Sequence, residues 1–120
     1  MRVVLVAVSG ALGAEARYGV GLWLGVQSFP WATLSINVAG SFALGFVLVF
    51  GGARWDRDVV VAVGVGFLGA FTTFSTFSYE AQALLRTERV GACAAYVALS
   101  LAGGIAAAAL GYALGTAAAR

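Results

Sequence analysis

Two long stretches of this chain carry no charged residue, and they limit its fold more than any other feature. One runs from Trp31 to Phe50 and the other from Val90 to Ala118. A helix needs about 20 apolar residues to cross the roughly 30 Å hydrocarbon layer of a membrane, and both stretches are long enough. Hydrophobic residues make up 62% of the 120 residues and charged residues only 10%, whereas a soluble domain carries about 25%. We therefore predict an integral membrane protein.

The remaining charges divide the chain into four candidate membrane-spanning helices joined by short connectors. The only proline, Pro30, falls in the first connector, where its missing N–H costs least. The run Val3–Val8 imitates a signal peptide, but apolar character resumes from Tyr18, so we expect the first span to be retained. The prediction is an all-α membrane fold with a single transmembrane domain over residues 1–120 and helices at about 3–26, 31–50, 59–85 and 90–118.

The arginines give only a weak signal for orientation in the membrane. Four would lie on the side of the chain ends and two on the opposite side, namely Arg2, Arg54, Arg57 and Arg120 against Arg86 and Arg89. Such a small bias over short connectors permits insertion in either direction. A uniform orientation and an antiparallel dimer of oppositely inserted copies both remain open. Small residues four apart, such as Gly21 and Gly25 or Gly111 and Gly115, let helices approach closely in lipid and favour a homo-oligomer.

Polar residues within the spans mark the candidate site, because polar groups inside a membrane are costly and tend to be functional. In the second span, Thr33, Asn37 and Ser41 recur every four residues and share one helical face. The amide of Asn37 offers two donors and an acceptor. It could serve an ion pathway or bond neighbouring helices, and the second span alone leaves both roles open.

The third span contains a segment, Gly69–Thr73, that is poorly suited to a continuous helix. Its glycine is followed by aromatic, hydroxyl and β-branched residues, which have low helix propensity. We predict that the third helix is broken near its middle. Broken backbone is tolerated in a membrane only where it is buried in protein or lines a wet cavity, and its exposed carbonyls could hold a small cation.

Two phenylalanines with hydroxyl residues between them follow this segment. Phe74 and Phe77 are three apart and share a helical face, and Ser75 and Thr76 place hydroxyl donors beside them. Aromatic rings are electropositive at their edges. A wall of ring edges, hydroxyls and an amide suits a small, strongly hydrated anion, because these groups replace its water. Plain packing is the alternative role for the two rings.

Three motifs resemble those of the Fluc (CrcB) fluoride channels, namely Gly10–Tyr18, Pro30–Phe42 and Gly69–Phe77. Their order and spacing agree with that family, and the resemblance covers nearly the whole chain. It implies a fluoride-selective channel of the bacterial inner membrane that exports fluoride passively from the cytoplasm and protects against its toxicity. It also implies a dual-topology, antiparallel homodimer in membrane lipid, with two pores built from both subunits.

The resemblance also implies roles for particular residues. Arg17 corresponds to an arginine of the aqueous vestibule, and the backbone carbonyls of Gly69 and Thr72 correspond to the site of a structural sodium ion on the dimer axis. Some members of that family continue the fourth-span polar track one and two turns beyond Ser100, where this chain has Gly104 and Ala108, so no donor path past Ser100 is expected. The implied fluoride pathway comprises Asn37, Phe74, Phe77, Ser75, Thr76, Tyr96 and Ser100.

Other functions also have to be weighed against these residues. Glu15 in the first span is similar to the proton-carrying glutamate of the small multidrug resistance exporters of cationic compounds, although Arg17 lies only two residues away. A membrane scaffold would explain the small residues but not Asn37 with its aromatic and hydroxyl run. Glu80 could be a solvated helix end, which is the interpretation we prefer, or a group near the pore mouth that influences fluoride exit. The lack of histidine and of paired catalytic carboxylates argues against an enzyme, and a net charge of +2 does not indicate a nucleic-acid partner.

Overall fold

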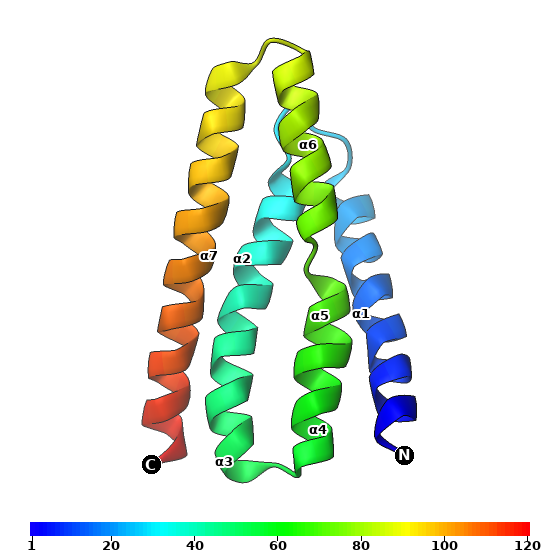
Figure 1. The fold of residues 1–120 in the computed structure, drawn as a ribbon, viewed down its shortest axis with the longest axis vertical. Coiled ribbons are helices and arrows are strands. Elements are labelled where there is room, and N and C mark those ends of the chain that lie inside the picture. The colour runs from blue at the N-terminus through cyan, green and yellow to red at the C-terminus, as the bar shows by residue number, and fades with distance from the viewer.

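The computed structural model describes residues 1–120 and contains helices and connectors but no strand. Four helical segments are long and apolar enough to cross a membrane, which confirms the predicted all-α, multi-pass class. The molecule measures 48 × 30 × 20 Å, so its long axis matches a bilayer of about 40–45 Å including the headgroups. Both chain ends lie at the same end of that axis (Figure 1). The four spans are Arg2–Leu24, Trp31–Arg54, Arg57–Arg86 and Val90–Ala119.

The second and third spans are each built from several consecutive helical pieces. The second contains α2 (Trp31–Phe46), the π-helical η1 (Val47–Gly51) and α3 (Gly52–Arg54). The third contains α4 (Arg57–Val61), the π-helical η2 (Ala62–Leu68), α5 (Gly69–Phe71) and α6 (Phe74–Arg86). The first and fourth spans are single helices, α1 (Arg2–Leu24) and α7 (Val90–Ala119).

The connector between α1 and α2 begins at a glycine that the turn requires. Gly25 follows the last residue of α1 with φ +68°, a left-handed conformation that side chains with a Cβ rarely adopt. Its N–H still donates to the carbonyl of Gly21, at 3.0 Å. The chain then turns back, and Pro30 precedes the first residue of α2. The first helix therefore ends at Leu24, two residues before the end expected from hydrophobicity.

Two residues of the third span, Thr72 and Thr73, have extended backbone conformations. Thr72 has φ −79° and ψ 159°, and Thr73 has φ −151° and ψ 117°. The ribbon between α5 and α6 is correspondingly uncoiled (Figure 1). The hydroxyl Oγ1 of Thr73 accepts a hydrogen bond from the N–H of Thr76 at 3.2 Å, so Thr73 caps the new N-terminus of α6.

In the half of the molecule nearer the chain ends, helices pack backbone against backbone through glycines. A Cβ on Gly45 of α2 would collide with the carbonyl oxygen of Ala108, and one on Gly111 of α7 would collide with that of Phe42. Likewise, a Cβ on Gly13 of α1 would collide with the carbonyl of Phe67 in η2. Dispersion contacts of this kind take the place of the hydrophobic effect in lipid. This close-packed half therefore depends on residues that have no side chain.

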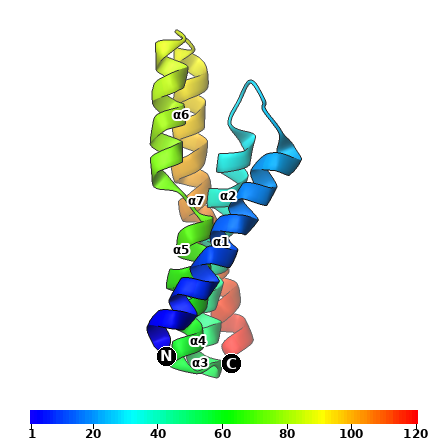
Figure 2. The same cartoon turned by 90° about the vertical axis from the view of Figure 1, so that its right-hand side faces the viewer.

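The half of the molecule away from the chain ends contains α6 and the α1–α2 connector (Figure 1). It is organised around a cluster of side chains instead. Tyr96 of α7 is completely buried, and around it pack Leu34 of α2, Phe77 and Leu84 of α6, and Cys93 of α7. Phe77 and Tyr96 have ring centroids 5.1 Å apart. Figure 2 shows α6 and the start of α7 diverging from the α1–α2 connector at this end. This open half holds most of the residues that the sequence marked as functional.

Candidate functional site

Asn37 of α2 binds the backbone of the third span where α5 and α6 meet. Its Oδ1 accepts a hydrogen bond from the N–H of Thr73 at 2.8 Å, and its Nδ2 donates to the carbonyl of Thr73 at 3.0 Å. In a continuous α-helix the N–H of Thr73 would bond the carbonyl of Gly69. The Asn37 side chain thus replaces a helical hydrogen bond and leaves the Gly69 carbonyl without that donor. One N–H of the amide remains free of these two bonds.

A cavity of about 250 Å³ lies beside this junction. Its lining includes Asn37, Ser41, Gly69, Thr72 and Phe74. The Thr72 hydroxyl donates to the carbonyl of Leu68 at 2.9 Å. The structure therefore brings the two residues expected to hold sodium into one cavity with Asn37. No cluster of acidic, histidine or cysteine side chains could hold a metal ion, whereas carbonyl and hydroxyl oxygens at unwound backbone suit a monovalent cation.

The two phenylalanines of the predicted pathway are neighbours in very different surroundings. Their ring centroids are 5.7 Å apart with the planes inclined at 45°. Phe74 is 77% exposed, whereas Phe77 is only 9% exposed and packs in the cluster around Tyr96. The ring of Phe74 is therefore largely uncovered on the single chain, whereas Phe77 belongs to the core.

The hydroxyls of Ser75 and Thr76 gather around the cap of α6. Thr73 Oγ1 lies 3.0 Å from Thr76 Oγ1, to which it donates, and 3.4 Å from Ser75 Oγ. Both Ser75 and Thr76 are exposed on the isolated chain. Thr76 lines one of the three cavities of the molecule, and Ser75 lines none.

Glu80 is not a solvated helix end, and that interpretation of the sequence is wrong. Its Oε1 accepts a hydrogen bond from the Thr33 hydroxyl at 2.9 Å, and its Oε2 accepts one from the Tyr96 hydroxyl at 2.7 Å. Thr33 and Tyr96 are buried and Glu80 is half-buried. The reason lies in the helical period, because Glu80 shares the inward face of α6 with Phe77 and Leu84 at spacings of three and four. That spacing was visible in the sequence and could have indicated the inward position.

Arg17 and Glu80 line the same cavity, which has a volume of about 330 Å³. Thr33, Thr73 and Thr76 also line it, so it contains one positive and one negative side chain with three hydroxyls. The two charged groups form no ion pair within 4 Å. The only ion pair in the structure joins Arg2 to Asp58. Arg17 therefore faces the cavity without being neutralised by direct contact.

Ser100 and Glu15 take no part in the hydrogen bonds described above. Ser100, one turn beyond Tyr96 on α7, has a buried hydroxyl with no hydrogen-bond partner. A Cβ on Gly104 would stand 3.6 Å from Ser41 Oγ, so at this level a hydroxyl comes from α2 instead of α7. Glu15 is exposed on α1 and lines none of the three cavities.

The three cavities form a series in which neighbouring cavities share lining residues. The largest, at the α1–α2 connector, shares Ala32 and Glu80 with the cavity of Arg17. The cavity of Arg17 in turn shares Thr73 with the cavity beside Asn37. The series follows the polar face of α2 along the line where it meets the third span.

Comparison with known proteins places this architecture in a family. Residues 4–112 match the family model described as CrcB-like protein, Camphor Resistance (CrcB). The chain belongs to the CrcB family. It is 46% identical over 121 residues to the fluoride-specific ion channel FluC 1 of Symbiobacterium thermophilum, an alignment that covers 96% of this chain and 98% of the relative. It is also 46% identical to the fluoride-specific ion channel FluC of Thermus thermophilus, covering 95% and 93%.

A third relative also carries the name of a fluoride-specific ion channel. The fluoride-specific ion channel FluC of Rhodospirillum centenum is 46% identical over 107 residues, which cover 83% of this chain and 84% of the relative. Membership of the CrcB family confirms the resemblance based on the three motifs. The names of these relatives describe ion channels, and none describes an enzyme or a multidrug exporter.

Proposed function

We propose that this CrcB protein is a fluoride-selective channel that lets fluoride leave the cytoplasm passively across the bacterial plasma membrane and thereby protects the cell. The observation that carries the proposal is the 46% identity to a fluoride-specific ion channel over 96% of the chain. The structure adds a physical basis, because hydroxyl donors line cavities that follow one another along α2.

Fluoride would move along this series of cavities by exchanging its water for protein donors. On the cavity that also contains Arg17, the Thr76 hydroxyl accepts from Thr73 and keeps its own O–H for an anion. The Thr33 and Tyr96 hydroxyls donate to Glu80 and would have to turn away from it to meet fluoride. Hydroxyl donors and ring edges can replace a hydration shell without binding the anion too tightly to release it. Glu80 competes with the anion for the Thr33 and Tyr96 hydroxyls and its negative charge opposes an entering anion, so we assign Arg17 the role of offsetting that repulsion.

The proposal includes an antiparallel homodimer in which the third span stays interrupted. Gly69 and Phe74 are exposed on the single chain, and polar backbone at membrane depth is costly where lipid touches it. A second copy over this face would remove that cost and bring the exposed ring of Phe74 into a pathway. Only 18 of 120 residues are buried in the single chain, which also favours a partner. The weak arginine bias permits the opposite orientation of the second copy.

A sodium ion on the dimer axis is the proposed cofactor. The Gly69 carbonyl lacks its usual helical donor, and Thr72 lies on the same cavity. The carbonyls of Gly69 and Thr72 from both copies would hold the ion, and its positive charge would stabilise the junction between α5 and α6.

The test is fluoride efflux from liposomes that contain the purified protein, followed with a fluoride-selective electrode and repeated with chloride. Rapid fluoride efflux with little chloride loss is expected. If neither ion moved while a proton gradient drove uptake of a cationic dye, the channel proposal would be wrong and an exporter would replace it.

A further inference from the structure

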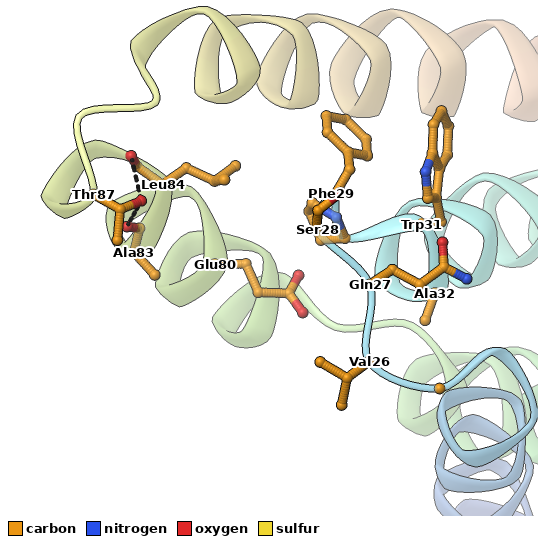
Figure 3. Close-up of a pocket in the computed structure, with 12 residues that line it drawn as sticks. Val26, Gln27, Ser28, Phe29, Trp31, Ala32, Glu80, Ala83, Leu84 and Thr87 are labelled. Atoms are coloured by element: carbon orange, nitrogen blue, oxygen red, sulfur yellow. Dashed lines mark hydrogen bonds between the residues drawn. The ribbon is translucent and has the colours of Figure 1, made fainter.

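The largest cavity of the molecule lies between the α1–α2 connector and α6, at the end away from the chain termini. Its volume is about 420 Å³, within the range of about 300–1,000 Å³ that small organic ligands use. Connector residues 25–30 and the first two residues of α2 form one wall, and Glu80, Ala83 and Leu84 of α6 with its C-cap Thr87 form the other. Figure 3 shows the Glu80 carboxylate directed between these walls.

Glu80 is the only charged residue that lines this cavity. Val26, Phe29 and Leu84 contribute apolar surface. Two of the polar side chains already donate to nearby backbone: Gln27 Nε2 to the carbonyl of Leu24 at 3.0 Å, and Thr87 Oγ1 to that of Ala83 at 3.1 Å. The cavity therefore combines apolar surface and neutral polar groups with a single carboxylate.

That carboxylate is not balanced by a positive side chain. Each of its oxygens accepts one hydrogen bond from a neutral hydroxyl, and no arginine forms an ion pair with it. An ionised carboxylate has about four acceptor positions, so about two stay available. Arg17 faces Glu80 only from the neighbouring cavity. A half-buried carboxylate without a cationic partner is unfavourable, and a ligand with positive charge would relieve that cost.

We infer that this cavity binds a small amphiphilic organic ammonium ion, with its ammonium group on Glu80 and its apolar body against Phe29 and Leu84. Arg89 donates to the carbonyl of Ser28, which ties the connector to the start of α7 and fixes the outer wall. The binding itself does not rest on the proposed channel function. If that function holds, a bound ligand would also block fluoride, because Ala32 and Glu80 belong to the next cavity in the series as well.

A calorimetric titration of the full chain in detergent tests the binding without any mutation. The probe is phenylbutylammonium, the matched neutral compound is phenylbutanol, and protein-free micelles give the background. The ammonium ion should bind at least about tenfold more tightly, as expected for charge-assisted hydrogen bonds. Equal binding of the two compounds would overturn the inference and identify the cavity as an apolar groove for lipid tails.

Variants then locate the site. Glu80→Gln should weaken phenylbutylammonium binding about tenfold, and Ala83→Phe, which keeps the charge but fills the cavity, should weaken it for both probes. The matched control is Glu88→Gln, because Glu88 is an exposed acid at the same end that does not line the cavity. Unchanged binding in both Glu80→Gln and Ala83→Phe would overturn the assignment. Fluoride efflux with and without the probe tests the block separately, so a failed channel proposal would leave the binding result intact.

Discussion

The close-packed half near the chain ends and the open half beyond Thr73 are stabilised by different means. In the close-packed half, glycines such as Gly45 and Gly111 let backbones touch. In the open half, Glu80 connects Thr33 of α2 to Tyr96 of α7 through side-chain hydrogen bonds, and cavities remain between the elements. The comparison teaches that a thin bundle can anchor itself by tight packing at one end and keep space for a site at the other.

The largest effect is expected from adding a side chain in the close-packed half. In Gly111→Val the new atoms would collide with the Phe42 carbonyl and force α2 and α7 apart, which should cost about 3 kcal/mol or more. Thermal unfolding in detergent would measure the loss. Gly19→Val is the matched control, since nothing lies within 4 Å of a Cβ at Gly19. Similar stability of the two variants would show that tight packing is not what holds this half.

The next effect concerns the junction between the two halves. Asn37→Ala removes both hydrogen bonds to Thr73 and leaves a partly buried backbone N–H and carbonyl unpaired, at a cost of about 2–4 kcal/mol. Fluoride efflux should fall together with the unfolding temperature. Asn37→Asp keeps an acceptor for the Thr73 N–H but loses the donor, so it should lie between the wild type and Asn37→Ala while still impairing flux.

The control for the junction is Ser35→Ala on the same helix, because the Ser35 hydroxyl bonds only the Trp31 carbonyl and the residue is exposed. If Asn37→Ala were no less stable than Ser35→Ala, the amide would not be holding the backbone of Thr73.

The two phenylalanines separate function from stability within the open half. Phe74→Ile should leave the unfolding temperature nearly unchanged, since the ring is 77% exposed on the single chain, while fluoride flux falls about tenfold from the loss of one ring-edge contact. Phe77→Ile should lower stability by about 1–3 kcal/mol through lost core packing. Paired flux and unfolding measurements check both, and normal flux in Phe74→Ile would remove this residue from the pathway.

The smallest effect belongs to the rim of the close-packed half. Arg2 and Asp58 form an ion pair of 2.5 Å with side chains 50% and 31% exposed. Exposed pairs of this kind contribute about 0.2–1 kcal/mol, so Arg2→Gln should lower stability by less than about 1 kcal/mol, and added salt should reduce the difference further. A double-mutant cycle with Asp58→Asn measures the coupling, and a value well above this range would mean that the rim matters as much as the glycine contacts.

The number and class of the helices could be predicted because they depend on long uncharged stretches. The uncharged run from Trp31 to Phe50 alone requires a membrane span, and the three motifs were specific enough to identify the CrcB family. The π-helical η1 and η2 were not predicted from the sequence, and η2 lies against α1 through contacts such as the bond from the Ser9 hydroxyl to the Ala62 carbonyl, at 2.7 Å. Those contacts join residues more than fifty positions apart.

The candidate site was predictable as a set of residues but not as an arrangement. The stripe of Thr33, Asn37 and Ser41 was visible, yet nothing in it indicated that Asn37 would bind the backbone of Thr73, 36 residues later. The position of Glu80 depends on where α6 restarts after Thr73, because a shift of one residue would turn the carboxylate out of the cavity. The sequence of α6 contains the inward pattern, but only the structure supplies its partners.

Both chain ends lie at the same end of the molecule (Figure 1). A short linker from Arg120 of one copy to Met1 of another can therefore yield only a parallel pair. If the proposed antiparallel dimer is to be written as one polypeptide, an additional membrane-crossing helix has to stand between the copies. The placement of two termini thus determines which gene fusions of this protein can work: a tandem fusion without the extra helix should insert both halves in the same direction and form no pore of its own.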